Sequence, residues 1–401
     1  MTRATPYPDT ITTPVSRLHL VFELSNSTWK LGFALTRNGK LRERNVPARD
    51  LAAVFAEIDT ARRHFKLSED APVVACYEAG RDGFWLYRAL TAVDVECAVV
   101  DPASILVDRR RVHAKTDRLD LKALRMLLVR YAEGERDVWR VVKVPPAEVE
   151  DLRLLGRERK TIVEECTAHV NRVRSMLSLY GVTVEGSVSP RLASTLPAIV
   201  GPSGDRLGPA AQGQIRRELE RIDLATKQIR EIEKQLRELF AARQREALGR
   251  RVDELGAAER ATEQARRLQE LRGIGQLGAF TLATEFFGWR QFKNRKQVAA
   301  LAGLAPVPHQ SGDMDRERNI SKAGNPRIRA LVVQLAWGWL RHQPQSALSR
   351  EFRQRTEEGK KRGRRRAIVA LARKLLVALW RYLDHGVIPD GAIFSPGVRA
   401  A

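Results

Sequence analysis

The sequence predicts an α/β domain at the N-terminus, then a long helical arm, then a mostly α-helical domain at the C-terminus. Three observations predict this order. Short apolar runs bounded by turn residues fill positions 18–144, and apolar residues recur at helical spacing over 147–180 and again over 211–248. Beyond residue 269, segments rich in glycine and proline separate further helical patterns. A chain of 401 residues is long enough for roughly two or three such domains.

The first domain opens with three antiparallel strands. Residues 1–17 hold three prolines and no apolar core of a signal peptide, so we expect a flexible arm there. Strands are predicted at 19–24, 29–36 and 41–46, and Asn38-Gly39 is a strong hairpin turn between the last two.

Helices and strands then alternate up to residue 144. We expect a helix at 49–65, a strand at 73–77 that ends on Glu78, a helix at 83–93, a strand at 95–100 and a helix that begins at Thr116. The resulting order, βββ-α-β-α-β-α, is that of an RNase H-like domain. It places Glu23 and Glu78 at strand ends, where α/β proteins usually build their sites.

The helix that begins at Thr116 carries two carboxylates, Asp117 and Asp120, in its first turn. Residues three apart share one helix face, so the two lie roughly 5–6 Å apart and repel each other unless a cation or a proton sits between them. With Glu23 and Glu78 they could hold two Mg²⁺ ions roughly 3.5–4 Å apart, which would activate a nucleophile and stabilise a leaving oxygen. The alternative is that Asp117 only favours the helix dipole and that Asp120 is a solvated charge.

The chain is strongly basic. Its 70 Lys and Arg residues against 48 Asp and Glu give a net charge of +22, which points to a polyanionic partner. No run reaches the ~18–20 apolar residues of a membrane span, so nucleic acid is favoured over a membrane surface. Three cysteines without metal-ligand spacing favour a reduced compartment, and we expect a cytoplasmic, nucleoid-associated protein. Basic residues crowd the helix of Asp117, and we expect nucleic-acid contacts from Arg109, Arg110, Arg111, Lys115 and Arg118.

The helical arm is predicted over residues 145–268. Pro145-Pro146 marks its start, and a loop or linker near 181–210 separates its two long helices. The second helix carries a heptad seam that Thr226 and Glu233 interrupt. The seam fits an intramolecular antiparallel hairpin, and it also fits a homo-oligomer, either a dimer or a tetramer, that forms through the arm. Its apolar residues are Ile215, Leu219, Ile222, Ile229 and Leu236.

Two segments of the C-terminal part are candidates for nucleic-acid binding. Residues 271–283 resemble a helix-hairpin-helix, in which Gly273 and Gly275 would expose backbone N–H groups to a phosphate. The alternative there is tight helix packing through small residues. A basic helical tail is expected over 346–401, and its basic cluster is either a solvated segment or a nucleic-acid contact. The cluster comprises Lys360, Lys361, Arg364, Arg365 and Arg366.

A serine in the domain predicted at 269–345 is a candidate nucleophile. Ser311 falls in a segment, 304–319, that is rich in proline, glycine and charge and reads as a loop. A serine is a poor nucleophile unless a base or a metal removes its proton, and nearby cations could stabilise a phosphate under attack. A plain turn is the alternative. The cations that follow the serine are Arg316, Arg318, Lys322 and Arg327.

Five stretches of the sequence resemble the transposases of the insertion sequence 110 family, which are relatives of the Piv-type invertases. The resemblance runs from about residue 18 to residue 340, with the motifs in the expected order. The stretches are Tyr77–Leu90, Ala114–Asp120, Leu301–Pro306, Gln310–Gly312 and Ile320–Asn325.

This resemblance implies a RuvC-like N-terminal domain with a DEDD tetrad and a C-terminal domain with a catalytic serine. Carried over, the serine falls on Ser311, with Ser321 as the alternative, and the tetrad falls on Glu23, Glu78, Asp117 and Asp120. Family members cut and rejoin DNA through a covalent serine–DNA intermediate, and a bridge RNA that is transcribed from the element guides them. The first tetrad position is usually Asp, so Glu23 extends that carboxylate by one methylene, which we interpret as a compensated subfamily trait.

We therefore expect an RNA-guided, Mg²⁺-dependent DNA transposase with a serine nucleophile. Two rivals belong to other classes. In an RNase H-like nuclease or junction resolvase, water would attack the phosphodiester and the serine would be idle. In a catalytically inactive nucleic-acid-binding protein, Glu23 would mark a degenerate site.

Overall fold

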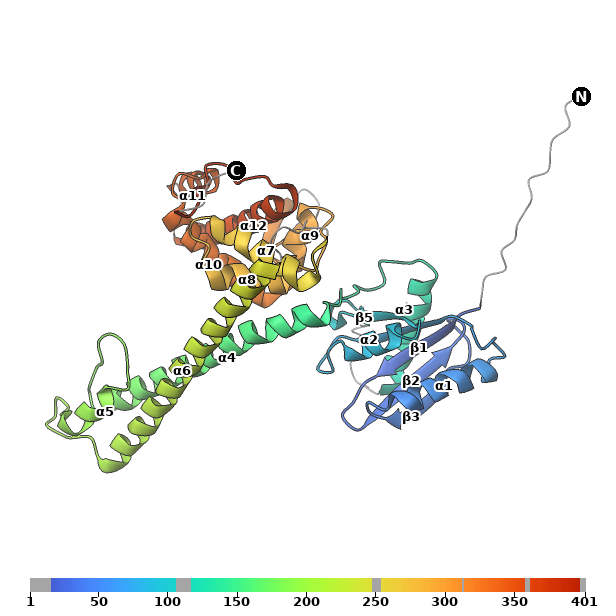
Figure 1. The fold of residues 1–401 in the computed structure, drawn as a ribbon, viewed down its shortest axis with the longest axis horizontal. Helices are drawn as coiled ribbons and strands as arrows, with labels where there is room; N and C mark the ends of the chain where they lie inside the picture. The colour runs from blue at the N-terminus through green and yellow to red at the C-terminus, as the bar shows by residue number, and fades with distance from the viewer. Residues whose placement is uncertain (1–15, 106–116, 247–253, 312–313, 358–360, 397–401) are drawn as a thin grey trace, which may run out of the picture. The chain divides into compact units, whose positions relative to one another are not determined.

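The computed structural model describes residues 16–105, 117–246, 254–311, 314–357 and 361–396 (Figure 1). The chain divides into two compact units, Met1–Val144 and Pro145–Ala401. No helix in the described ranges is long and apolar enough to cross a membrane.

The first unit is built on a five-stranded mixed sheet with the order β3-β2-β1-β4-β5. The pairs β1–β2 and β2–β3 are antiparallel, whereas β1–β4 and β4–β5 are parallel. All five predicted strands are confirmed, as is the antiparallel opening of the domain. The strands are β1 (Leu18–Glu23), β2 (Thr28–Ala34), β3 (Arg42–Pro47), β4 (Val73–Glu78) and β5 (Glu96–Val100).

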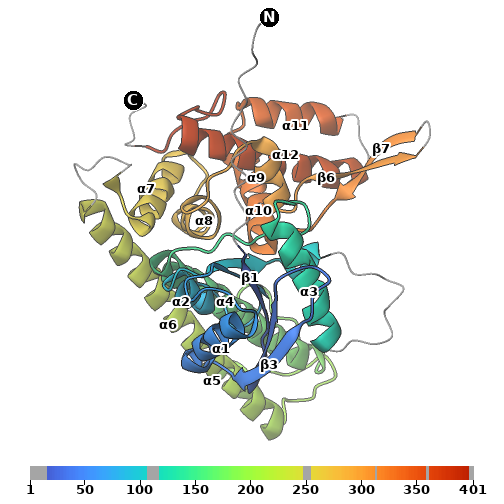
Figure 2. The same ribbon diagram turned by 90° about the vertical axis from the view of Figure 1, so that its right-hand side faces the viewer.

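Helices cover both faces of this sheet because successive strand residues point to opposite sides. Helices α1 (Leu51–His64) and α2 (Trp85–Thr91) pack on the face that buries Leu20 and Phe22. Helix α3 (Asp117–Ala132) packs on the other face, over Val21. Figure 2 shows the first two helices on one side of the strands and α3 on the other.

The second unit begins with a helical hairpin. Helices α4 (Ala147–Ser178) and α6 (Pro209–Glu246) run antiparallel side by side (Figure 1), and the predicted long helices are confirmed. Ile215, Leu219 and Ile222 of the heptad seam are buried against α4, so the intramolecular alternative holds for this part of the seam. The segment between the helices was expected to be a loop, but it also contains short helical turns at Leu192–Thr195 and Leu196–Ala198.

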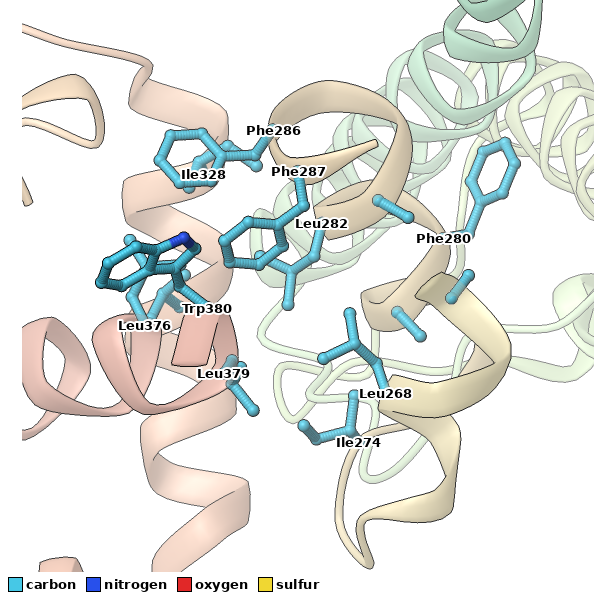
Figure 3. Packing of buried hydrophobic residues seen from close by; sticks show 14 of the residues in the cluster. Leu268, Ile274, Phe280, Leu282, Phe286, Phe287, Ile328, Leu376, Leu379 and Trp380 are labelled. Atoms are coloured by element: carbon cyan, nitrogen blue, oxygen red, sulfur yellow. The ribbon is translucent and has the colours of Figure 1, made fainter. Parts of the chain in front are cut away.

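A helical bundle forms the rest of the second unit, and one apolar core holds it together. Figure 3 shows Leu282, Phe286 and Phe287 packed towards Leu376 and Trp380. Asn294 caps α9 and Asn325 caps α10 through their side-chain oxygens, as their positions before apolar helices indicate. The helices are α7 (Ala257–Glu270), α8 (Gln276–Leu282) with a π-helical turn (Ala283–Phe287), α9 (Arg295–Leu301), α10 (Pro326–His342), α11 (Ala347–Glu357) and α12 (Lys361–His385).

The expected loop at 304–319 is wrong, because this segment is a β-hairpin. Strand β6 (Pro306–Ser311) pairs antiparallel with β7 (Met314–Ile320), with an irregular register between Pro306 and Pro308. Two prolines argue against a central strand, but a two-stranded ribbon has only edge strands, where a missing N–H donor is tolerated.

Candidate active site

Two acids of the predicted tetrad end adjacent parallel strands at the same level. In the β1–β4 pair, Val21 lies opposite Cys76, and Glu23 and Glu78 each follow two residues later as the last residue of their strand. Neighbouring strands lie about 4.8 Å apart. Glu78 is exposed and Glu23 is half-buried, whereas the strand residues before them are buried. The sheet therefore presents both carboxylate-bearing residues at one solvent-accessible edge.

Both acids belong to the face of the sheet that α3 covers. Val21 and Cys76 are buried in the cluster that α3 forms with the sheet. Because side chains alternate with a period of two, Glu23 and Glu78 share that face with them.

Helix α3 begins at this same edge and runs antiparallel to β1. A Cβ on Gly32, which pairs with Val21, would lie 3.6 Å from Leu121 in the first turns of the helix. At the other end, Arg37 donates to Glu135 just beyond α3, with Nη2–Oε1 at 2.8 Å. Arg37 follows Ala34, the partner of His19 near the start of β1. The first turn of α3 therefore lies at the carboxyl end of β1.

The length that each residue adds to α3 and to β1 brings the four acidic positions to one end of the domain. Asp117 lies one turn before Leu121, or ~6 Å along the helix. Glu23 lies two residues beyond Val21, or ~7 Å along the strand. Asp120 lies one turn before Leu124, and Leu124 is buried on the same helix face as Leu121. The backbone thus carries 23, 78, 117 and 120 to the same edge.

The structure describes the backbone of Asp117, Arg118 and Asp120 but not their side chains. The arrangement of the four tetrad side chains therefore stays a prediction. Among the side chains that are described, no group of three or more His, Cys, Asp or Glu could hold a metal ion. Arg109, Arg110, Arg111 and Lys115 lie outside the described residues.

Another acid at this edge has a structural task. Asp101 follows β5, next to Glu78, which pairs with Val100. Its carboxylate accepts from the Ala103 N–H at 3.0 Å and lies 3.5 Å from Arg140. Asp101 therefore caps the turn after β5.

The candidate nucleophile, Ser311, is the last residue of β6 and pairs with Met314 across the hairpin tip. The structure does not describe the side chain of Ser311, nor the side chains of Arg316 and Arg318 in β7. Ser321, the alternative, follows β7, and its N–H donates to Ala305 O at 2.8 Å. The hairpin thus carries Ser311 to its tip and leaves Ser321 at its base.

The motif residues around this base hold the hairpin in place. The Asn325 N–H donates to Leu301 O at 2.8 Å, and the Lys322 N–H donates to Gly303 O at 3.2 Å. A Cβ on Gly324 would lie 2.5 Å from Gly303 N and 2.6 Å from Leu301 O, so only glycine fits there. The stretches 301–306 and 320–325 are therefore a backbone clamp.

Of the residues in the second unit that were predicted to contact phosphates, some are packed against neighbours and others are exposed. Gly273 has φ +95°, and a Cβ there would lie 2.9 Å from His342, so tight packing applies to this glycine. Gly275 begins α8 with open space around its Cβ position. Lys322 is exposed and Arg327 is half-buried in the first turn of α10. Arg364, Arg365 and Arg366 are exposed in α12, the side chain of Lys361 is not described, and Lys360 lies outside the described residues.

The strand order β3-β2-β1-β4-β5, with carboxylates at the ends of β1 and β4, defines a domain of the RNase H-like class. Residues 33–182 match the DEDD transposases of the IS110 type, and residues 265–350 match the family described as transposase IS116/IS110/IS902. The chain belongs to this IS116/IS110/IS902 transposase family.

Curated relatives from bacteria agree with this assignment. The chain is 38% identical over 392 residues to a Sinorhizobium fredii protein, y4rJ, which is named as a transposase, and the alignment covers 97% of each chain. It is 29% identical over 272 residues to the transposase for insertion sequence element IS1111A of Coxiella burnetii, across 68% of this chain and 67% of the relative.

Proposed function

We propose that this protein is an insertion-sequence transposase that cuts DNA and rejoins it through a serine–DNA intermediate. The observation that carries the proposal is the shared edge of Glu23 and Glu78 beside the start of α3. Family membership supplies the reaction class, and the hairpin that ends in Ser311 supplies a candidate nucleophile.

The acidic edge suits Mg²⁺, because carboxylates and phosphate oxygens are the ligands that Mg²⁺ prefers. Glu23, Glu78, Asp117 and Asp120 are the residues that would hold it. When bound, the metal would stabilise the negative charge that develops on a phosphodiester under attack. The four carboxylates would by themselves repel DNA, so cation binding and DNA binding at this edge are expected to be coupled.

In the proposed step, the Ser311 Oγ forms a bond to phosphorus while the bond from phosphorus to one sugar oxygen breaks. The serine proton is passed on to a base, and the released sugar oxygen ends as a hydroxyl. One phosphodiester is exchanged for another, so the linkage energy is kept and the reverse reaction can join a new DNA end.

The same proposal includes a guide RNA and self-association. A net charge of +22 supports binding of several phosphates, which should make affinity fall steeply with salt. The guide RNA rests on the family resemblance. The proposal also includes a homo-oligomer that forms through the arm, where it would cover the exposed Leu154 (57%), Leu179 (83%) and Leu224 (57%). A nucleoid-associated location in the cytoplasm accompanies this function.

The experiment incubates the protein with Mg²⁺, the guide RNA transcribed from the element and DNA of the element ends, and it looks for a DNA adduct that resists denaturation. The adduct is expected with the parent protein and with Ser321→Ala, and it is expected to vanish with Ser311→Ala. If Ser311→Ala still cuts the DNA at the parent rate, the nuclease or resolvase rival is correct. If the parent binds DNA but neither cuts it nor forms an adduct, the protein is a non-catalytic binder.

A further inference from the structure

A wide groove opens in the second unit, beside the base of the hairpin that carries Ser311. Its volume is about 1250 Å³, which exceeds the roughly 300–1,000 Å³ of small-molecule pockets. Residues of helices α9, α11 and α12 line it together with the segment 387–390. Ala305 and Pro306, at the start of β6, complete the wall. A groove of this size suits a stretch of polymer better than a metabolite.

The walls of the groove carry excess positive charge. Five cationic side chains and two carboxylates line it. Glu351 is paired with Lys374, with Nζ–Oε2 at 2.5 Å, and with Arg355 at 2.8 Å. Asp390 lies 3.8 Å from Arg350. Glu351 is therefore already paired with two cations, whereas Asp390, which is 79% exposed, makes only a long ion pair, and the lining keeps an excess of cations.

Four cations of the groove remain available to a ligand. Within the part of the chain that the structure describes, none of them lies within ion-pair distance of a carboxylate. Two are on α9 and two are on α12, and all four are exposed or half-buried. They are Arg295, Lys296, Arg373 and Arg381. Cations from two helices that line one groove are an arrangement that holds a phosphate backbone.

The position of the groove relates it to the proposed chemistry. Pro306 lines the groove and Ser311 ends the same strand five residues later. Five strand residues span at most ~17 Å, which is about five nucleotide steps of B-form DNA. A DNA strand in the groove can therefore reach the hairpin tip over a few nucleotides.

We propose that this groove binds the backbone of the DNA strand that the Ser311 hairpin acts on, a few nucleotides from the phosphodiester that is cut. This inference rests on the proposed function for the role of Ser311. The groove itself is argued from its charge, its size and its place beside β6. Its apolar lining, which includes Val377 and Val387, would contact sugars and base edges without sequence preference.

The test measures how tightly the full chain binds a labelled single-stranded DNA of about 20 nucleotides. This length exceeds the roughly 4–16 nucleotides that a single-strand-binding groove usually covers. All proteins carry Ser311→Ala, so binding is measured without covalent chemistry. The groove variant is Arg373→Gln with Arg381→Gln. The matched control is Lys227→Gln with Lys234→Gln, which removes the same charge from two α6 residues that are 68% and 60% exposed.

We expect the dissociation constant of the groove variant to rise at least ~10-fold and its salt slope to fall by about 1.4, since each phosphate contact contributes ~0.7 for a single strand. The control should change the dissociation constant less than ~2-fold. Equal losses in both variants, or no loss in the groove variant, would overturn the proposal. An RNA of the same sequence is the second arm, and loss of RNA binding with DNA binding intact would also overturn it.

Two further measurements keep the outcome clear. The urea unfolding curve shows whether the groove variant is folded. If it is not, Arg295→Gln with Lys296→Gln on α9 takes its place with the same expectations. A failed adduct experiment with the Ser311 parent would reject the serine mechanism but would leave the binding result unchanged, so the two failures can be told apart.

Discussion

Glu23 and Glu78 stand at the same register position of two adjacent parallel strands, two residues beyond the pair Val21 and Cys76. Parallel neighbours end at the same edge, so the chain separates these acids by fifty-five positions and the sheet brings them together. Repulsion between two such carboxylates is relieved by a bound cation. We therefore propose that the edge, rather than either acid alone, is the functional unit.

Replacing Glu78 by Gln tests that unit with little change in shape. Glu78→Gln removes the charge of a proposed Mg²⁺ ligand, so Mg²⁺-dependent cutting of DNA should fall at least ~100-fold. Loss of a residue that only supports a metal ligand costs less, ~10–100-fold. The rate of strand cutting is the measurement. Glu69→Gln, at an exposed position before β4, is the matched control and should keep the parent rate. A Glu78→Gln protein that cuts DNA at the parent rate would rule the edge out as the metal site.

Glu23 offers a separate test, since the family resemblance places Asp at this position. Glu23→Asp withdraws the carboxylate by one methylene from a site that we interpret as adjusted to the longer side chain. Misplacement by ~1 Å can cost up to ~100-fold, so we expect the cutting rate to fall by about 10- to 100-fold. A rate that rises in Glu23→Asp would show instead that glutamate weakens this copy of the site.

The acidic edge could be predicted because it follows from local patterns. The run before Glu23 and the run before Glu78 are short, apolar and bounded by turns, and the element order βββ-α-β-α-β-α is that of an RNase H-like domain. The leucines at 121 and 124 fix which face of α3 meets the sheet. The positions of two strand ends and one helix start were enough to predict that these acidic residues lie at one edge of the domain.

The hairpin and the groove could not be predicted in this way. The hairpin contains Pro306 and Pro308, and its strands are rich in charged and polar residues, so it lacks the alternation of a half-buried strand. The groove depends on how α9, α11 and α12 pack, and its cations on α9 and on α12 are about eighty residues apart in the sequence. The same limit applies to Glu285, whose partners lie in another helix.

Glu285 is a buried acid that fixes the arm to the helical bundle. It lies in the π-helical turn, its side chain is 4% exposed, and it accepts from Arg153 Nε at 2.9 Å and from Arg157 Nε at 2.7 Å, both in α4. Glu285→Gln removes the only carboxylate that these arginines are shown to hydrogen-bond in the part of the chain that the structure describes, so the free energy of unfolding should fall by about 3–5 kcal/mol. Urea unfolding measures this.

The control for this change lies in the same arm. Arg159 of α4 pairs with Glu233 of α6 at 2.7 Å, but these side chains are 26% and 28% exposed. Glu233→Gln should therefore cost only about 0–1 kcal/mol. If the two variants lose equal stability, burial of Glu285 is not what makes its pair important.

Glu285 also predicts an acid dependence of stability. Burial alone would raise its pKa, but hydrogen bonding from Arg157 and the charges of Arg153, Arg157 and Arg327 hold the pKa below its ordinary value of 4.5. A carboxyl whose pKa is lowered on folding contributes fully above its ordinary pKa, and the contribution is lost as pH falls through the folded value. The parent should therefore lose stability below about pH 4.5 more steeply than Glu285→Gln. Parallel curves of unfolding free energy against pH would contradict this.

Gly324 provides a test of the clamp that holds the Ser311 hairpin. A Cβ at this position would meet backbone atoms of the α9 end at 2.5–2.8 Å, and backbone atoms cannot rotate away as a side chain can. Gly324→Ala should cost about 1–3 kcal/mol of stability and should displace the base of the hairpin. Gly363→Ala is the matched control, because nothing lies within 4 Å of its Cβ position and alanine favours α12 by about 0.5–1 kcal/mol. Serine–DNA adduct yield in folded Gly324→Ala protein, measured beside the urea unfolding curve, should fall below that of Gly363→Ala. Equal yields would mean that the clamp serves stability alone and does not position the nucleophile.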